Sequence, residues 1–545
     1  MFTFSSTVIV LLMVLFYGIN FYFSLRIGRK NENVDGYMVS NGSIGFGMSA
    51  ASMTATWIWA ASFYAAASSA YKYGLSGALH YGLWGALMIM FIYPFGRRFR
   101  ELAPDAHTLA EILHARHGQH SQMILAGSNI VGSVISLMVN FTAAGALVDI
   151  LSPLSFTQGV LITAIGVLSY TLWSGFRSSV FTDFGQLVAM IVAAVIIIPM
   201  MFFTLGGPSL FETGRHHLTA DQLNFFSQTA ILEQGAPFFV AVLAYAIGNQ
   251  TIAQRLFAVR EDLIKPSFIT ATIGYAAIVI GLGMLGLLAL FAGIVPIDGD
   301  LNNLIPQMAA TYLSPFMVGV LFIMVIGALS STADSDLSAL SAIVMTDIYG
   351  KQIAKNQPNP KTMLLVGRMT MIAATAIGVV FATMKLDILS MLIFVGALWG
   401  AIVFPVISSL YWNRVTAKAF NWSVLIAFVS FLIVRFEWLP LTGITAIGFE
   451  ILAAIGAGVV FGLMSFGFFG KKAGLTVGIL AALIVLPYSL GFLRDYVTLL
   501  SSLTAYGASA LVCTGITLCS KQKPFQFEQI DKMVIEFHDL PDNKE

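Results

Sequence analysis

Residues 311–348 form an apolar stretch that carries a row of hydroxyl and carboxyl side chains in its second half. Ser331 and Asp334 are three residues apart, as are Thr332 and Ser335, so on a helix hydroxyls and one carboxylate share a face. Hydroxyl and carbonyl oxygens together with one carboxylate suit a hard cation such as Na⁺. This spacing therefore predicts a cation site inside the stretch.

The same row of side chains has a plainer interpretation. Serine and threonine often join helices within a membrane, and for any single hydroxyl this role is the commoner one. A carboxyl group deep in an apolar span is costly unless it is paired or faces a cavity, which favours a functional role for Asp334. Asp336 points to a different face, where hydration near the cytoplasm would account for it.

A second feature is the stretch from Ala50 to Gly74, which combines small residues and hydroxyls with Trp57 and Trp59. This composition is consistent with a broken helix, whose unwound residues would offer carbonyl groups to an ion or a solute. A close-packed helix interface with two bulky tryptophans explains the stretch as well. Taken alone, the simpler interpretation is preferred.

Two more polar sets lie in or beside apolar runs. Asp183 follows Thr182 in the first turn of a predicted helix, where an acid also serves as a partner of the helix dipole. Tyr245 and Asn249 are four residues apart in one span and therefore stack on one face. A tyrosine there is equally well explained as a packing residue with a satisfied hydroxyl.

Membrane helices are the elements that must position these residues. The chain has 545 residues, of which 57% are hydrophobic and 10% charged, whereas a soluble domain carries about 25% charged residues. This composition excludes a secreted enzyme, a nucleic-acid-binding protein and a disordered regulator. With 28 basic and 27 acidic residues, the net charge of +1 provides no field that would attract nucleic acid.

Runs long enough for a membrane-spanning helix predict about fifteen spans. They lie near residues 4–25, 43–70, 81–96, 121–148, 157–175, 182–205, 236–254, 268–294, 311–348, 364–384, 387–411, 419–436, 442–468, 473–492 and 496–519. Most of the 28 basic residues fall in alternate loops, Arg29, Lys30 and Arg255 among them. The positive-inside rule then places the N-terminus outside and the C-terminus inside.

The segments between the spans are short. Residues 97–120 are predicted to contain an interfacial amphipathic helix that starts near Thr108. Residues 521–545 are predicted to form a polar, partly disordered tail. Because no segment has the size of a catalytic domain, function is expected between the helices and an enzyme is not expected.

At these residues the chain resembles the solute:sodium symporter family, over about residues 1–520. The matching motifs are Tyr170-Thr-Leu-Trp-Ser-Gly-Phe-Arg through Thr182-Asp183 and Gln186, Gly248-Asn249-Gln250 to Gln254-Arg255, and Ser331-Thr332 leading to Thr346-Asp347-Ile348-Tyr349. Within that family the chain is most similar to the urea active transporter subgroup. That similarity rests on Tyr71-Lys-Tyr-Gly74, on Ala103-Pro-Asp-Ala-His-Thr108 with Ala115-Arg116-His117-Gly118, and on the fifteen-span count.

The resemblance implies an all-α polytopic membrane protein with a LeuT-type core of two inverted five-helix repeats. On this chain the core would be residues 43–411, with the repeats at 43–205 and 236–411. Residues 1–30 would be an extra N-terminal helix. Residues 412–520 would be C-terminal accessory helices, and residues 521–545 a cytoplasmic tail.

The resemblance also implies where ions bind. A Na⁺ site between the second and ninth spans would use the carbonyls of Ala50, Met53 and Ala328 and the hydroxyls of Ser331 and Thr332. A second cation or proton site, found in some relatives, would use Asp183, Asp334 and Ser335. Two neighbouring carboxylates either bind a cation tightly or share a proton, so Na⁺ is the first choice of coupling ion and H⁺ the second.

The family's solute and gate positions fall on Trp57, Trp59, Val242, Tyr245, Asn249 and Gln250. Trp57 and Val242 stand where the sugar carriers have glutamine and asparagine, so a sugar is not expected. Tyr245 matches a tyrosine that closes the pocket from the inside. Aromatic walls of this kind suit a compact, polar, uncharged solute.

The expected function is therefore cation-coupled symport of urea, or of a similarly small polar solute, by alternating access in a bacterial inner membrane. The alternatives are an H⁺-coupled symporter of a polyamine, an amino acid or a short carboxylate, a passive channel, and a carrier-like sensor module. The expected partners are the solute and the lipid bilayer, without nucleic acid. The oligomeric state is not indicated.

Overall fold

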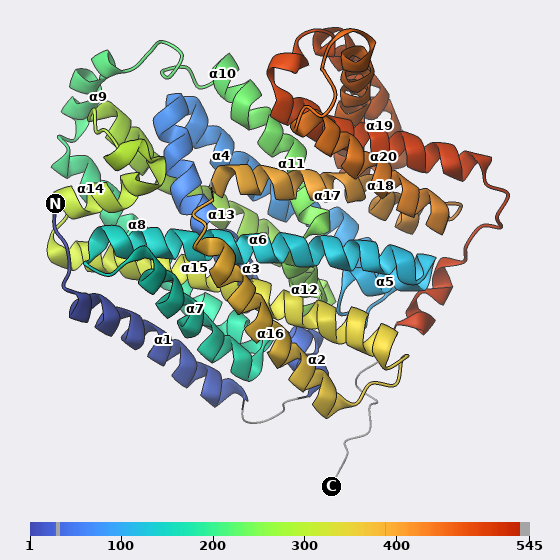
Figure 1. Ribbon diagram of the computed structural model, residues 1–545, viewed down its shortest axis with the longest axis horizontal. Helices are drawn as coiled ribbons and strands as arrows, with labels where there is room; N and C mark the ends of the chain where they lie inside the picture. Colours follow the sequence, from blue (N-terminus) through green and yellow to red (C-terminus); the bar gives the residue numbers. More distant parts are fainter. Residues whose placement is uncertain (29–32, 387, 535–545) are drawn as a thin grey trace.

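The computed structural model describes residues 1–28, 33–386 and 388–534, and these form a bundle of α-helices (Figure 1). Arg29, Lys30 and the last part of the predicted tail, residues 535–545, lie outside the described residues. Thirteen helices in the described part are long and apolar enough to cross a membrane, against about fifteen expected. The described residues contain one isolated bridge, between Ile44 and Val259, in place of any sheet.

The long helices account for most of the chain. They are α1 Ser6–Gly28, α4 Ala60–Leu102, α6 Gln119–Leu151, α7 Phe156–Ser174, α8 Phe176–Thr204, α11 Ala236–Gly248, α13 Ile264–Phe291, α15 Pro315–Ile343, α16 Pro360–Ala382, α17 Ile388–Tyr411, α18 Ala417–Arg435, α19 Gly443–Ser489 and α20 Val497–Cys519. The shorter ones are α2 Val34–Val39, α3 Phe46–Trp57, α5 Leu109–His117, α9 Pro208–Gly214, α10 Gln228–Ala230, α12 Gln250–Ala258 and α14 Leu304–Tyr312.

Two of the long helices bend sharply at a glycine. Each was expected as two membrane spans but forms one bent helix, which accounts for thirteen helices in place of fifteen. Gly74 in α4 has φ 65°, and Gly470 in α19 has φ 82°. Both values lie in the region that favours glycine because a Cβ would clash with the backbone. The bend in α4 separates part of the expected span 43–70 from the expected span 81–96. The bend in α19 separates 442–468 from 473–492.

Two helices are interrupted near the middle of the bundle. The first break lies at Ile58 and Trp59, between α3 and α4. The broken helix is therefore present, although the simpler packing interpretation was preferred for this stretch. The second lies at Asn249, between α11 and α12, in a span predicted to be continuous. There Asn249 Oδ1 accepts a hydrogen bond of 2.8 Å from the Thr251 N–H and so caps α12.

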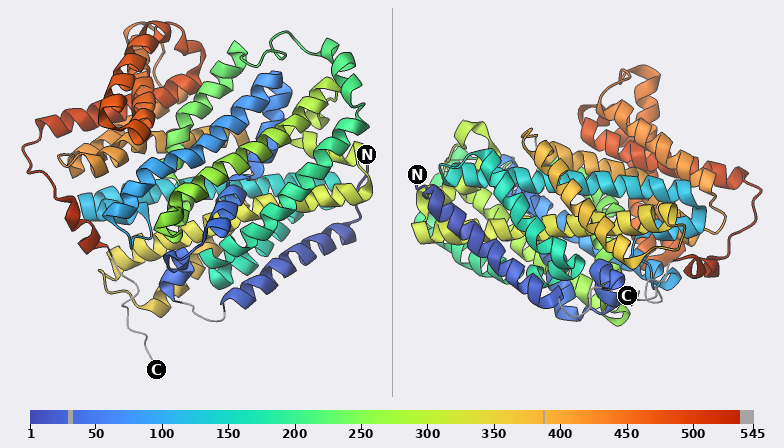
Figure 2. Two further views of the ribbon diagram at one scale, coloured as in Figure 1. Left: turned by 180° about the vertical axis from the view of Figure 1, so that it is seen from behind. Right: turned by 60° about the horizontal axis from the view of Figure 1, so that its bottom comes forward.

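The helix α15 runs through the centre of the bundle (Figures 1 and 2). It contacts α3, α6, α7, α8 and α16 and continues as a π-helical segment, Val344–Ile353. At the edge of the bundle α1 packs on α7 and α8, and α18, α19 and α20 pack together on another side. Apolar side chains such as Val195 and Phe203 stay exposed, as expected for helices that face lipid.

The helices α9, α10 and α14 lie at one end of the bundle, and α5 lies at the other (Figure 1). We call these the vestibule end and the α5 end. The helix α5 begins after Thr108, whose hydroxyl accepts a 3.0 Å hydrogen bond from the Glu111 N–H, as predicted. Its polar side does not face solvent, however, because Glu111 and Arg116 are buried along with its apolar residues.

Part of what covers α5 is the C-terminal segment, residues 521–534. The Phe525 N–H donates to the Asn413 carbonyl at 2.9 Å, and the Arg116 guanidinium lies 4.4 Å from the Phe525 ring centre. The Lys351 ammonium donates to the Met533 carbonyl at 2.9 Å, and Ile530 is fully buried. The predicted disordered tail is therefore docked as far as Val534.

Candidate functional site

A buried ion pair lies beside the row of polar side chains in α15. Arg255 Nη2 of α12 is 2.9 Å from Asp183 Oδ2 of α8, and both side chains are almost completely buried. Ser52 of α3 donates to Asp183 Oδ2 at 2.6 Å, and the hydroxyl of Ser331 donates to Oδ1. Asp183 thus joins α3, α8, α12 and α15 through its two oxygens.

The second buried acid, Asp334, is held by hydroxyl groups. Tyr170 of α7 donates to Asp334 Oδ2 at 2.6 Å, and Ser179 of α8 donates to Oδ1 at 2.5 Å. Ser335 donates to the same Oδ1 at 3.2 Å and in turn accepts from Arg255 Nη2 at 2.7 Å. Within the described residues no ion pair includes Asp334, so hydroxyl groups are its direct partners.

Charge counting makes this cluster attractive to a cation. Arg255 balances one of the two carboxylates, and one negative charge remains in a site sealed from water. A buried charge without a partner is costly, so a bound cation or proton stabilises the cluster. The predicted second site, Asp183, Asp334 and Ser335, is therefore assembled as one group. Arg255, which the loop pattern placed near the inner surface, belongs to it.

The residues of the predicted Na⁺ site lie on α3 and α15, two helices that pack against each other. The Thr332 hydroxyl donates to the Thr56 carbonyl at 2.7 Å, which brings the last turn of α3 against α15. On α3 the Ala50 carbonyl accepts a 2.8 Å hydrogen bond from the Thr54 hydroxyl. Met53 lies on the same buried helix, and Ala328 is buried on α15 one turn before Thr332. The donor set contains only oxygen atoms, as a hard cation requires.

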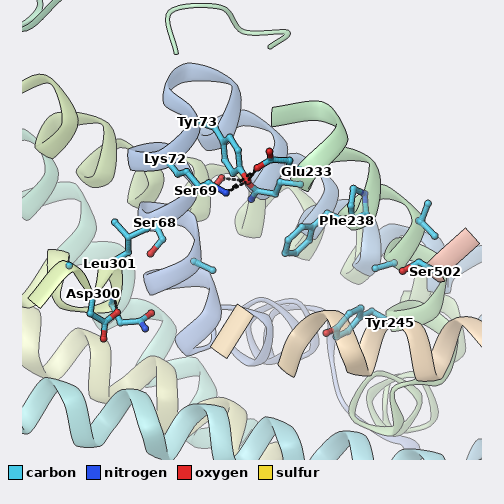
Figure 3. Close-up of a pocket in the computed structure, with 18 residues that line it drawn as sticks. Ser68, Ser69, Lys72, Tyr73, Glu233, Phe238, Tyr245, Asp300, Leu301 and Ser502 are labelled. Carbon is cyan, nitrogen blue, oxygen red and sulfur yellow. Dashed lines mark hydrogen bonds and ion pairs between the residues drawn. The ribbon is translucent and has the colours of Figure 1, made fainter. Parts of the chain in front are cut away.

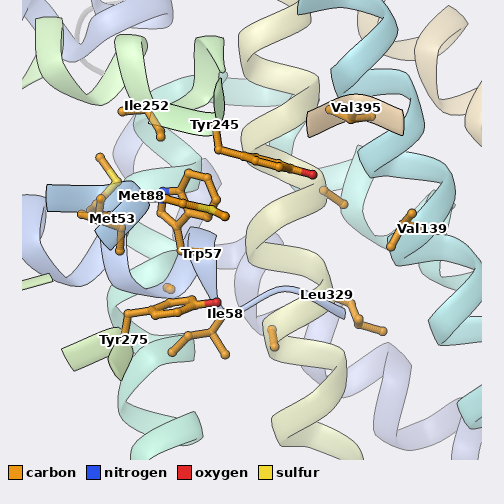
Figure 4. Close-up of a cluster of buried hydrophobic side chains, with 14 of the residues drawn as sticks. Met53, Trp57, Ile58, Met88, Val139, Tyr245, Ile252, Tyr275, Leu329 and Val395 are labelled. Carbon is orange, nitrogen blue, oxygen red and sulfur yellow. The ribbon is translucent and has the colours of Figure 1, made fainter. Parts of the chain in front are cut away.

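A small chamber adjoins this group of helices. It has a volume of about 20 Å³, enough for one or two water molecules. Its walls are Thr56, Trp57, Trp59, Gly132, Ile135, Ser136, Tyr245, Asn249, Thr251, Thr332, Asp336, Val395 and Trp399. The ring centres of Trp57 and Tyr245 are 6.0 Å apart, and those of Tyr245 and Trp399 are 5.1 Å apart. Figure 4 shows Trp57 and Tyr245 side by side in this cluster.

A larger cavity of about 330 Å³, the vestibule, lies on the other side of Tyr245. Figure 3 shows Tyr245 at its base and an ion pair at its rim. The Lys72 ammonium is 3.0 Å from Glu233 Oε2, and the Tyr73 hydroxyl donates to the same oxygen at 2.7 Å. Tyr245 lines both cavities, so its ring is the partition between them.

Four of the six predicted solute or gate residues line the chamber, namely Trp57, Trp59, Tyr245 and Asn249. The other two lie elsewhere. Val242 is fully buried outside the lining of both cavities. Gln250 points toward the segment before α5, where its Nε2 donates to the His107 carbonyl at 2.9 Å.

Sequence reasoning missed several members of these sites. Arg255 and Tyr170 were within the matched motifs but carried no assigned role, and Ser52 and Ser179 had no signal beyond a hydroxyl in an apolar run. Trp399 contributes a fourth aromatic wall of the chamber from α17, beside Trp57, Trp59 and Tyr245. A tryptophan in an apolar span is indistinguishable from packing until its neighbours are known.

A separate charged network lies at the α5 end. His107 Nε2 is 2.8 Å from Asp35 Oδ1, and its Nδ1 is 3.7 Å from Glu111 Oε2. The ammonium of Lys351 lies 3.5 Å from Glu111 Oε1. Burial lowers the pKa of His107, but the nearby carboxylates of Asp35 and Glu111 outweigh it and raise the pKa to about 9.

This raised pKa predicts a loss of stability in alkaline solution. The stabilisation by His107 is fully present below its unfolded pKa of about 6.5 and is lost as the pH rises through about 9. We expect the melting temperature to fall between pH 7 and pH 10, with a lost contribution of about 3 kcal/mol. In the His107→Gln variant, thermal melts in detergent should show a shallower fall over the same range. An equally steep fall in the variant would show that another group titrates.

Comparisons with known proteins bear on this geometry. The sequence model described as "Sodium:solute symporter family" matches residues 37–427. The chain is 26% identical to the sodium/pantothenate symporter of Escherichia coli, over 74% of this chain and 85% of that protein. It is 22% identical to probable urea active transporter 1 of Schizosaccharomyces pombe, over 75% of this chain and 66% of that protein.

A solved structure has the same fold. It is the substrate-bound, outward-open state of a Na⁺-coupled sialic acid symporter, with a TM-score of 0.67 and 16% sequence identity. The match covers 87% of this chain and 97% of that one.

Proposed function

Because the chain belongs to the sodium:solute symporter family, we propose that it carries a small polar solute, urea-like in size and hydrogen bonding, by alternating access. Na⁺ is the coupling ion, and the protein is a multi-pass membrane protein rather than an enzyme. The identity of the solute and the residues that bind it are our inference. The relatives named above carry different solutes, so the family alone does not choose among them.

One observation supports the proposal most directly. The cluster around Asp183 and Asp334 sets two carboxyl groups against one guanidinium. It bridges α3, which ends at a break, and α12, which begins at one, to α8 and α15. A cation bound there, or at the hydroxyls of Ser331 and Thr332, stabilises the arrangement in which these helices touch. Ion binding thereby favours the conformation in which the chamber walls are assembled, which is how it promotes solute binding.

We further propose the topology of this carrier. If α4 and α19 each cross the membrane twice, bending at Gly74 and Gly470, the chain crosses fifteen times, with α3 and the start of α4 as one broken span. The vestibule end then faces outside and the α5 end faces the cytoplasm. Residues 43–205 and 236–411 form the inverted repeats, 1–30 precede them, and 412–520 and the tail follow.

Uptake into proteoliposomes tests this function. Labelled urea should accumulate against its gradient when Na⁺ is high outside, and collapse of the Na⁺ gradient should abolish the accumulation. Accumulation driven by an imposed H⁺ gradient alone would instead assign the charge on Asp334 to a proton. Uptake that never exceeds equilibrium under either gradient would support a channel and contradict symport.

The hydroxyl ligands give a sharper test. Ser331→Ala and Thr332→Ala each remove one buried hydroxyl contact, which costs about 1 to 2 kcal/mol. We expect the Na⁺ concentration for half-maximal uptake to rise by about tenfold in each variant. Ser330→Ala is the matched control, because the Ser330 hydroxyl pairs with the Tyr17 hydroxyl at 3.1 Å. An unchanged Na⁺ dependence in both test variants would exclude this ion site.

A further inference from the structure

Asp336 of α15 is a third buried acid, and neither ion site uses it. Its side chain is 1% exposed and forms part of the chamber wall, beside Thr332 and Tyr245. The side chains of Ser133 and Ser136 of α6 lie near the carboxyl group. Within the described residues its Oδ2 has no hydrogen-bond partner. A buried acceptor that is left unpaired at a cavity wall indicates that something else pairs with it.

No charged side chain nearby serves as the partner of the Asp336 carboxyl group. No ion pair in the described part of the chain includes it, and the nearby charge of Arg255 acts on it only through space. Arg255 directs its N–H groups to Asp183, Ser52, Ser335 and the Thr251 carbonyl instead. Among the described residues that line it, the chamber therefore has one carboxyl group and no basic side chain.

The remaining walls are suited to the same kind of ligand. Three aromatic residues of the chamber, Trp57, Tyr245 and Trp399, meet edge to face around it. Aromatic rings attract a cation that is held out of water, and tryptophan does so most strongly. A carboxylate together with aromatic walls is complementary to a compact group that bears both N–H donors and positive charge.

We propose that Asp336 is the residue that recognises the solute, and that the preferred solute is a small planar organic cation rich in N–H groups, such as a guanidinium. The inference rests on the proposed transport function and narrows its substrate class. Urea has the same planar shape and N–H donors, but it leaves the charge of Asp336 unbalanced. Guanidinium supplies two parallel N–H donors and the balancing charge at once.

The matched pair of guanidinium and urea tests this recognition. Uptake of each labelled compound is measured in proteoliposomes under a Na⁺ gradient, for the wild type and for Asp336→Asn. We expect the wild type to take up guanidinium at least about tenfold more efficiently than urea. In Asp336→Asn the two should be taken up about equally, because the amide keeps the shape but loses the charge.

Asp347→Asn is the matched control. This buried acid lies in the π-helical segment that continues α15, where it accepts a hydrogen bond of 2.7 Å from Gln122 Nε2. It should retain the wild-type preference. A wild type that prefers urea, or an Asp336→Asn variant that keeps the preference for guanidinium, would overturn the inference. A changed Na⁺ requirement with an unchanged preference would likewise overturn it, by making Asp336 an ion ligand.

Binding separates a failure of this inference from a failure of the transport proposal. Labelled guanidinium and urea are bound to the purified protein in detergent, where no gradient is needed. If neither compound is transported but guanidinium binds to the wild type and not to Asp336→Asn, the recognition holds and the transport proposal fails. If neither compound binds to the wild type, the recognition fails.

Discussion

Arg255→Gln is expected to abolish Na⁺-driven uptake and to lower the free energy of unfolding by about 3 to 5 kcal/mol. Arg255 Nη2 is 2.9 Å from Asp183 Oδ2, and the two side chains are 2% and 0% exposed. Removing the guanidinium leaves Asp183 and Asp334 as two buried carboxylates without a fixed positive partner. Glutamine keeps most of the volume, so the loss reports charge rather than packing. Thermal melts and uptake measurements on the same preparation would detect both effects.

The double variant Asp183→Asn/Arg255→Gln is the control for this prediction. Removing both charges leaves no unpaired ion, so it should regain most of the stability that Arg255→Gln loses. It should not regain Na⁺ dependence, because the carboxylate that receives Ser52 and Ser331 is gone. If the double variant were as unstable as the sum of the two single variants, the pair would not act as one unit.

Gly286→Ala is expected to cost about 3 kcal/mol and to reduce the yield of folded protein sharply. A Cβ at Gly286 of α13 would lie 2.0 Å from the backbone carbonyl oxygen of Ala67 in α4. The obstacle is backbone, so the helices themselves would have to separate. The part of α4 that would move runs from the break at Trp59 to Lys72 at the vestibule rim, so solute uptake should fall as well. The melting temperature and the monodisperse yield would measure the effect.

Gly281→Ala provides the comparison on the same helix. The nearest atom to a Cβ there is the Ile198 Cδ1 at 3.3 Å, the far end of a flexible side chain. Alanine forms helices better than glycine by about 1 kcal/mol, so this variant should be neutral or more stable. Equal losses in the two variants would show that α13 does not depend on close approach to α4.

The row of polar residues in α15 was the part of the site most readable from the sequence. An acid in an apolar span is costly, so a role for Asp334 could be predicted, and its hydroxyl partners on α7 and α8 confirm that it is not exposed to lipid. The separate face predicted for Asp336 is also confirmed. The hydration expected there is not, because Asp336 is 1% exposed. Spacing places residues around one helix but does not state what packs against each side.

Arg255 shows why the rest could not be predicted. It follows an apolar run closely and precedes a charged loop, the usual position of a residue that reports topology. In the structure the helix breaks at Asn249, and α12 begins there as a separate helix. On α12 the Arg255 side chain reaches Asp183 inside the bundle. The burial of the polar side of α5 could not be predicted for a related reason. Its local pattern is amphipathic, but segments distant in sequence cover its polar side.

The docked segment 521–534 determines where this chain can be shortened or fused. Its contacts reach Arg116 on α5, Asn413 between α17 and α18, and Lys351 beyond the end of α15. Ending the chain at Ser520 would remove Ile530, which is fully buried, and expose the residues that it packs against. It would also remove the Met533 carbonyl, which accepts a hydrogen bond from the Lys351 ammonium. An affinity tag or fluorescent fusion should therefore be attached beyond Val534. A fusion at Ser520 would alter the packing around α5, and the transport measured would be that of the altered protein.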